Sequence, residues 1–303
     1  MILPPVNANR NPFIYLNNMG KVMTSAAAIA ICAAAAFAVG SAARAETGAW
    51  AEAAHARVRL VSAVAATGSA DSVLLGLEIK LDPGWKTSWR APGEGGLPPR
   101  FDWSGSGNLA AVAVSWPAPQ RFEIGGMASV GYADHAILPL QAKLARPGEA
   151  LALKLALRYA VCREICMLVE ANVALDLPAG PAAGAPSPHA AAIARFEARV
   201  PRPAAEHGWR VAGISRKTMG EGSARRELVI VDIASDGAPL GAPELLIEGH
   251  DVRFGIAIPK PGPDAALRRF VAAVHGAGPP SGDLVLTLVD GERAGTFTVA
   301  APR

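Results

Sequence analysis

The chain reads LALKLALRY over residues 151–159, and this stretch decides the fold class. Its leucines and Tyr159 recur at every second position, with Lys154 and Arg158 between them. A period of two is that of a β-strand with one face in a core and the other in water. The stretch therefore predicts a half-buried strand.

Runs of the same kind lie on both sides of this strand. They cover Val58 to Leu60, Val73 to Leu81, Ala111 to Trp116, Ala136 to Leu140, Ala171 to Leu177, Trp209 to Ile214, Glu227 to Ile233, Leu245 to Ile247, Asp283 to Val289 and Thr296 to Val299. Turn-forming residues separate them, as in Asp82-Pro83-Gly84, Arg146-Pro147-Gly148 and the hairpin turn Asp290-Gly291. Short strands with no long helix between them predict an all-β protein built from β-sandwiches.

A stretch rich in proline, glycine and alanine, Pro178 to Pro188, interrupts the strand pattern. A short helical candidate follows, with Ile193, Phe196 and Val200 at helical spacing, and prolines end it. We therefore predict two sandwich domains, residues 46–177 and 205–303, joined by a linker at 178–204 that contains a short helix. Domains of about 130 and about 100 residues are each large enough to hold a core.

Residues 1–45 have the layout of a secretory signal peptide: basic residues, an apolar stretch from Ala26 to Val39, and small residues ending at Ala45. The apolar stretch has 14 residues, whereas a helix needs roughly 20 to cross a bilayer. We expect cleavage after Ala45, export to an oxidising compartment and no stable membrane insertion. The residues before Met19 add nothing that a signal needs, so Met19 and Met23 are alternative starts.

Removal of the expected signal also balances the charge. The whole chain has 29 basic and 26 acidic residues, and three of the basic ones, Arg10, Lys21 and Arg44, lie in residues 1–45. Nucleic acids and anionic membranes bind clustered positive charge. We therefore expect neither as a partner.

Two of the three cysteines, Cys162 and Cys166, lie outside the expected signal. In an exported protein such a pair is interpreted first as a disulfide. Four steps along an extended strand cover about 13 Å, and a disulfide needs Cα atoms within roughly 4.4 to 6.8 Å. We therefore expect the pair in a connection between strands, with Val161 to Met167 turned or helical. A disulfide that closes so small a ring stabilises the folded chain by only about 2 kcal/mol. A structural brace and a redox pair both remain open as interpretations.

Four aromatic residues are candidates for a cap over the cysteines or a partner-docking surface, with ordinary core packing as the alternative: Trp85, Trp89, Trp103 and Tyr132. The three tryptophans fall in a region, Pro83 to Gly107, that we predict to be rich in loops. His135 is a candidate for tuning a thiol or binding a metal, with a merely solvated side chain as the alternative.

The cysteine segment YAVCREIC, residues 159–166, resembles that of the N-terminal periplasmic domain of the DsbD and ScsB thiol:disulfide interchange proteins. Supporting runs are LDPGWKTSWR at 81–90, LPPRFDW at 97–103, and Gly131-Tyr132 through Leu138-Pro139-Leu140. The likeness covers about residues 55–177. The three-residue spacing of the cysteines is that of the ScsB-like branch, whereas DsbD separates them by five, and Met167 stands where related sequences often have proline.

The resemblance implies an immunoglobulin-like sandwich in which Cys162 and Cys166 carry electrons, without a cofactor, from a membrane-embedded reductase to periplasmic thiol or disulfide proteins. The membrane segments and thioredoxin-like domain of the full-length family members have no counterpart in this sequence, so we expect the reductase to be a separate protein. The second half has no comparable motif, although ScsB-like proteins also pair two immunoglobulin-like domains.

Three functions of different classes compete. The first is a thiol-disulfide oxidoreductase that acts through a mixed disulfide. The second is a soft Cu(I) site formed by Cys162, Cys166, Met167 and His135. The third is a structural β-sandwich binding module in which the disulfide braces a loop. No Ser-His-Asp set, phosphate loop or paired-carboxylate motif supports a hydrolase.

Overall fold

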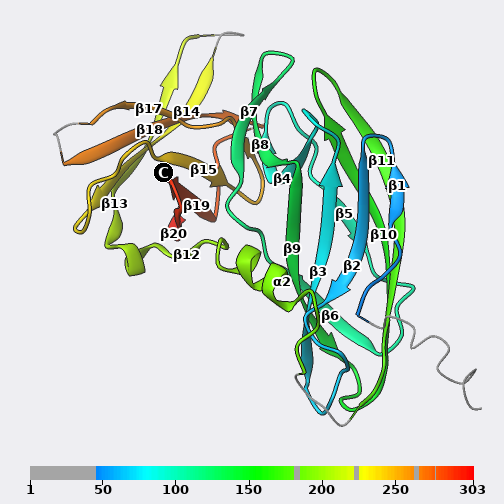
Figure 1. Cartoon of the computed structure of the whole chain (residues 1–303). Coiled ribbons are helices and arrows are strands. Elements are labelled where there is room, and N and C mark those ends of the chain that lie inside the picture. The colour runs from blue at the N-terminus through cyan, green and yellow to red at the C-terminus, as the bar shows by residue number, and fades with distance from the viewer. Residues whose placement is uncertain (1–45, 181–184, 222–224, 263–265, 277) are drawn as a thin grey trace, which may run out of the picture. The chain divides into compact units, whose positions relative to one another are not determined.

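The computed structural model describes residues 46–180, 185–221, 225–262, 266–276 and 278–303 (Figure 1). The expected signal peptide at 1–45 lies outside these residues. None of the helices within the described ranges has the length and apolar character needed to cross a membrane.

The alternating stretch at 151–159 lies in strand β10 (Leu151–Cys162). Its four leucines and Tyr159 are buried, while Lys154 and Arg158 are exposed. The period of two is therefore confirmed, and it orients one face of β10 toward the core of the first sandwich.

The first sandwich consists of two antiparallel sheets. One has the strand order β1-β2-β3-β9-β6, and the other has the order β11-β10-β4-β8-β7, with β5 also paired to β10. The remaining strands are β1 (Ala51–Ala53), β2 (Ala56–Ser62), β3 (Ser72–Leu81), β4 (Lys86–Gly93), β5 (Arg100–Asp102), β6 (Leu109–Val114), β7 (Gln120–Ile124), β8 (Met127–Ala133), β9 (His135–Leu144) and β11 (Cys166–Leu177).

The prediction of a loop-rich region from Pro83 to Gly107 is wrong in part, because β4 and β5 lie within it. β4 is hydrogen-bonded between β10 and β8 inside its sheet. Its polar residues Thr87 and Ser88 are buried, and each makes a hydrogen bond with the backbone of another segment. Buried polar residues of this kind hide the apolar and polar alternation on which the sequence prediction depends.

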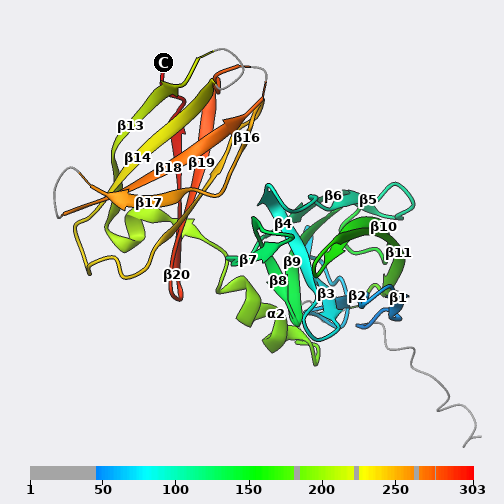
Figure 2. The same ribbon diagram turned by 90° about the horizontal axis from the view of Figure 1, so that it is seen from above.

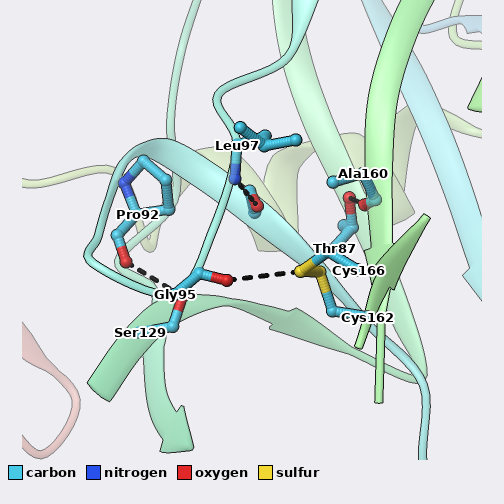
Figure 3. The surroundings of a disulfide bond; sticks show 9 residues. Thr87, Pro92, Gly95, Leu97, Ser129, Ala160, Cys162 and Cys166 are labelled. Carbon is cyan, nitrogen blue, oxygen red and sulfur yellow. Dashed lines mark hydrogen bonds between the residues drawn. A yellow bond between two sulfur atoms is a disulfide. The ribbon is translucent and has the colours of Figure 1, made fainter. Parts of the chain in front are cut away.

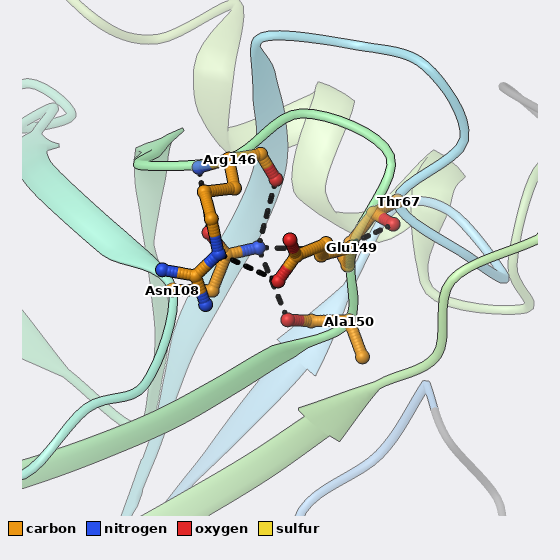
Figure 4. Close-up of polar contacts among 5 residues, drawn as sticks. All are labelled: Thr67, Asn108, Arg146, Glu149 and Ala150. Atoms are coloured by element: carbon orange, nitrogen blue, oxygen red, sulfur yellow. Dashed lines mark hydrogen bonds and ion pairs between the residues drawn. The ribbon is translucent and has the colours of Figure 1, made fainter.

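A cluster of hydrogen bonds fixes the turn that leads into β10 (Figure 4). The Asn108 side-chain amide donates to the backbone carbonyls of Arg146, Glu149 and Ala150, and its carbonyl accepts from the Arg146 amide. Thr67 Oγ1 donates to the Glu149 carbonyl. The predicted turn at 146–148 is thus tied to two other loops, which sets where β10 starts.

Helix α2 (Ala190–Glu197) confirms the predicted short helix. It buries Ile193 and Phe196 on the first sandwich and lies beside β9 (Figure 1). Just before the helix, the Ser187 amide donates to the Ala63 carbonyl and the Ser187 hydroxyl donates to the Ser62 carbonyl. From about residue 185 the connection is therefore packed onto the first sandwich.

The second sandwich also has two sheets and a core of its own (Figure 2). One sheet has the order β12-β20-β19-β15, and the other has β13-β14-β18-β16, with β17 paired to β18. The elements are β12 (Arg202–Pro203), a 3-10 turn (Ala204–His207), β13 (Trp209–Met219), β14 (Arg226–Ser235), β15 (Glu244–Glu248), β16 (Arg253–Phe254), β17 (Ile258–Pro261), β18 (Leu267–His275), β19 (Asp283–Asp290) and β20 (Arg293–Ala300). The predicted hairpin at Asp290-Gly291 joins β19 to β20. The all-β class with two sandwiches is confirmed.

We predict that a fragment covering Glu46 to Leu177 folds alone, and that extending it to Val200 stabilises it. The extension adds α2, and full burial of an apolar side chain is worth about 1.5 to 3 kcal/mol. Urea unfolding of both fragments measures the difference, and Ile193→Ala in the longer one should remove much of the gain. An unfolded short fragment beside a cooperative full chain would show the domain division to be wrong.

Candidate functional site

The two cysteines form a disulfide at the tip of the β10–β11 hairpin (Figure 3). The two strands pair along their whole length, with Cys162 directly opposite Cys166 and their Cα atoms 4.1 Å apart. Only residues 163–165 make the turn, where the Arg163 amide donates to the Ile165 carbonyl at 3.1 Å.

The prediction that the pair occupies a connection between strands is therefore wrong, because both strands continue to the cysteines. The expectation of a turned backbone holds for residues 163–165 alone. The separation of about 13 Å holds for two residues four steps apart on one continuous extended strand. The cysteines lie on two strands. Opposite residues of an antiparallel pair lie about 4.5 to 5.5 Å apart, so a tight hairpin brings residues i and i+4 together while each remains extended.

The two sulfur-bearing residues differ in exposure. Cys162 is 1% exposed and packs with Ile124 and Ala160, whereas Cys166 is only partly buried. Phe122 adds an aromatic side chain to this small cluster. Cys162 is thus the inner and Cys166 the outer member of the disulfide.

The last two residues of β4 and the loop after them, residues 92–97, lie over the outer sulfur, and we call this segment the glycine-rich loop. The Gly95 carbonyl oxygen is 3.2 Å from Cys166 Sγ (Figure 3). A disulfide sulfur carries no hydrogen, so this is a close contact; after reduction the Cys166 thiol can donate a hydrogen bond to that oxygen. The loop thus covers the one sulfur that is partly open to solvent.

Two serines of the first sandwich hold this loop. Ser129 Oγ donates to the Pro92 carbonyl at 2.9 Å, and the Leu97 amide donates to Ser88 Oγ at 3.2 Å. A Cβ atom at Gly96 would lie 2.6 Å from Pro92 Cβ and 2.8 Å from Ser88 Oγ. Glycine is therefore required there for the loop to approach so closely.

The strand register places a cation beside the inner cysteine. Lys86 of β4 pairs with Cys162, and Thr87 Oγ1 donates to the Ala160 carbonyl at 2.8 Å, which fastens β4 to β10 at this point. The Lys86 ammonium donates to the Gly84 carbonyl and lies 5.8 Å from the Phe122 ring centroid.

Exposed apolar side chains surround the disulfide, and sequence reasoning missed them. We call four of them the apolar rim; they are between 46% and 69% exposed: Leu97, Met127, Ile165 and Leu168. Leu97 ends the glycine-rich loop, Met127 packs against Gly95, and the other two flank Cys166. They come from three separate segments, so only the folded topology brings them together.

Residues 57–178 match the family model described as "Thiol:disulfide interchange protein DsbD, N-terminal". The first sandwich is similar to the DsbD N-terminal domain. The match runs from β2 to the end of β11 and includes both cysteines. The family is one of thiol:disulfide interchange proteins.

A solved structure shares the fold over most of the chain. The N-terminal periplasmic domain of ScsB from Proteus mirabilis is similar with a TM-score of 0.66 and 21% sequence identity, covering 85% of this chain and 99% of that one. The family match ends at residue 178, and 85% of the chain is a longer stretch than that match. The structural likeness therefore extends into the second sandwich. No curated protein matches the chain.

Two of the four predicted cap residues are core residues of the first sandwich. Trp89 is completely buried, and Tyr132 of β8 donates from its hydroxyl to the Pro117 carbonyl at 2.8 Å. Burial also raises the pKa of Tyr132 well above its ordinary value. A docking role for these two residues is therefore wrong, because no partner can touch them in this structure.

The other two tryptophans are half-buried and engaged elsewhere. Trp85 stacks on His55, with ring centroids 3.8 Å apart, and Trp103 stacks on Phe101 at 6.2 Å. The hydrophobic cluster around the disulfide, taken over the described residues, includes neither of them.

The residues of the alternative copper site are not brought together. His135 belongs to the other sheet, where its Nε2 lies 3.0 Å from Glu78 Oε1. Burial raises the pKa of Glu78, but Arg59 and His135 outweigh that effect and lower it. Met167 packs against the main core, on the face of β11 opposite to Cys166. The described ranges contain no group of three or more His, Cys, Asp or Glu side chains able to hold a metal.

We predict that reduction of the disulfide leaves the domain folded, because the main core does not include either cysteine. The double variant Cys162→Ser, Cys166→Ser should lose only about 2 kcal/mol of unfolding free energy, the loop-entropy value for so small a ring. Circular dichroism with and without dithiothreitol, and urea unfolding, measure both effects. Loss of the β signal on reduction would make the disulfide a structural staple.

Proposed function

We propose that the chain is a periplasmic thiol-disulfide oxidoreductase that passes electrons through Cys162 and Cys166 between a separate membrane-embedded reductase and periplasmic thiol or disulfide proteins. The observation that supports this most is the asymmetry of the disulfide, with one sulfur inside and one at the surface, in a domain of a thiol:disulfide interchange family. The exchange needs no cofactor.

Electron uptake begins at the outer sulfur. A thiolate of the reductase attacks Cys166 Sγ, the Cys162–Cys166 bond breaks, and Cys162 leaves as a thiolate. A second thiol of the reductase then attacks the mixed disulfide and releases Cys166. The chain gains two electrons as a dithiol, and the reductase is left with a disulfide.

Electron delivery uses the same atoms in reverse. The Cys166 thiolate attacks a target disulfide, which forms a mixed disulfide and releases one target thiol. Cys162 then attacks Cys166 Sγ, which restores the intramolecular bond and releases the second target thiol. Cys162 therefore acts only within the chain, as its burial requires.

The surroundings of the disulfide fit these steps. The apolar rim offers a partner an uncharged surface around Cys166, of the kind that marks an interaction site. The Gly95 carbonyl touches the sulfur that must be attacked, so the glycine-rich loop has to move before a partner thiol can reach it.

We predict that the two single cysteine variants trap partners unequally. Cys162→Ser leaves the outer thiol and should form a stable mixed disulfide with oxidised glutathione or with the disulfide form of a periplasmic thiol protein. Cys166→Ser leaves only a buried thiol and should react at least about tenfold more slowly. Mass spectrometry under non-reducing conditions measures the adduct, and the double variant is the control.

Faster trapping by Cys166→Ser would reverse the assignment of the attacked sulfur. The carrier proposal itself fails if neither variant forms an adduct under conditions where an established exchange protein does. Tight binding of Cu(I) by the reduced wild type through both sulfurs would then favour the metal-binding alternative.

A further inference from the structure

The glycine-rich loop that covers Cys166 is also held from its other side, by the second sandwich. Both sandwiches belong to one compact unit. Glu94 Oε1 lies 2.9 Å from His275 Nε2 at the end of β18. A Cβ atom at Gly93 would lie 2.7 Å from Ile256 Cδ1, so the loop backbone is in close contact with that side chain. Two successive loop residues thus touch the second sandwich, next to the residue that covers the sulfur.

A part-buried ion pair and a buried apolar contact beside the loop hold the second sandwich in this position. Arg90 of β4 donates two hydrogen bonds to the Glu248 carboxylate, both at 2.8 Å. Leu246 of β15 is 4% exposed and belongs to the main core of the first sandwich. The second sandwich is therefore anchored independently of the loop and can serve as a fixed support for it.

The loop itself has little stiffness. Three of its six residues are glycines, which have the greatest backbone freedom. A cavity of about 240 Å³, lined by Pro92, Gly93, Gly96, Glu248 and Phe254 among others, separates part of the loop from the second sandwich. Its position over Cys166 therefore depends on a few contacts: two serines and Met127 on one side, and His275 and Ile256 on the other.

We propose that the second sandwich controls access to the disulfide by holding the glycine-rich loop over Cys166. Glu94, His275 and Ile256 are positioning residues, since they act on the sulfur only through the loop. The Glu94–His275 pair draws the loop toward β18, and Ile256 packs against Gly93. Weakening either contact increases the fraction of molecules in which Cys166 is open. Control of access by the second sandwich would regulate the proposed exchange. This proposal rests on the proposed function in one respect, that Cys166 is the sulfur that is attacked.

The test is the rate at which dithiothreitol reduces the disulfide in the chain from Glu46 to Arg303. An exposed ion pair is worth about 0.2 to 1 kcal/mol, so His275→Ala and Glu94→Gln should each speed reduction about 1.5-fold to fivefold. Ile256→Ala should speed it as well. Because the first two variants remove the same contact, combining them should give no more than either alone.

Charge and control variants separate this role from simpler ones. Attack by a thiolate anion is helped by loss of a negative side chain, and it is slowed or left unchanged by loss of a histidine, which is positive only when it is protonated. A plain field effect would therefore speed reduction in Glu94→Gln and would not speed it in His275→Ala. The proposed role moves both in the same direction. Arg210→Ala removes a comparably exposed ion pair, with Asp236, elsewhere on the second sandwich and should leave the rate unchanged.

Acceleration by all three variants with an unchanged Arg210→Ala supports the proposal. It is overturned if His275→Ala is slower than or equal to the wild type, if Ile256→Ala has no effect, or if Arg210→Ala accelerates reduction as much as the others. Thermal unfolding of each variant shows that the compared proteins are folded. Dithiothreitol is a small molecule, so its reduction rate does not depend on any protein partner. Failure of the access proposal and failure of the carrier proposal can therefore be distinguished.

Discussion

The register between β10 and β11 is the constraint on which the rest of the site depends. The two strands pair over twelve positions and end with Cys162 opposite Cys166. A slip of one residue would turn every side chain to the other face, which would expose the leucines of β10 and separate the sulfurs. The hydrogen bonds of Asn108 and Thr67 fix the start of β10, and the buried leucines fix its orientation. The disulfide is thus placed by the core and does not itself hold the core together.

The asymmetry of the site follows from the same arrangement. β4 lies against β10 beyond Cys162, so Cys162 is enclosed by strands on both sides, while Cys166 stands on β11 at the edge of the sheet. An edge residue remains open unless another segment covers it. The glycine-rich loop provides that cover, and its contact through Gly95 uses a backbone oxygen, so it needs no particular side chain. Access to the disulfide then becomes a property of the loop and of what the loop rests on.

The sequence predicted the parts that depend on local pattern. The alternation at 151–159, the turns at 82–84 and 146–148 and the short helix with Ile193 and Phe196 are all present. β4 was missed, since Thr87 and Ser88 are buried by hydrogen bonds that only the folded chain supplies. Trp89, for which core packing was the alternative to a cap or docking role, lies in β4 and is completely buried. The cysteine count and the expected export singled out Cys162 and Cys166, and the resemblance then favoured a redox role for them over a structural one.

The rest of the site depends on contacts between distant segments. Gly95, Ile124 and Met127 carry no motif, and they reach the disulfide only through the pairing of β4, β7 and β8. The most direct test of electron exchange through the Cys162–Cys166 pair is its reduction potential, from equilibration with glutathione or thioredoxin buffers. A pair that exchanges electrons with partners should have a potential within the span of known exchange catalysts, about −120 to −270 mV. A value below about −300 mV, typical of structural disulfides, would contradict the account.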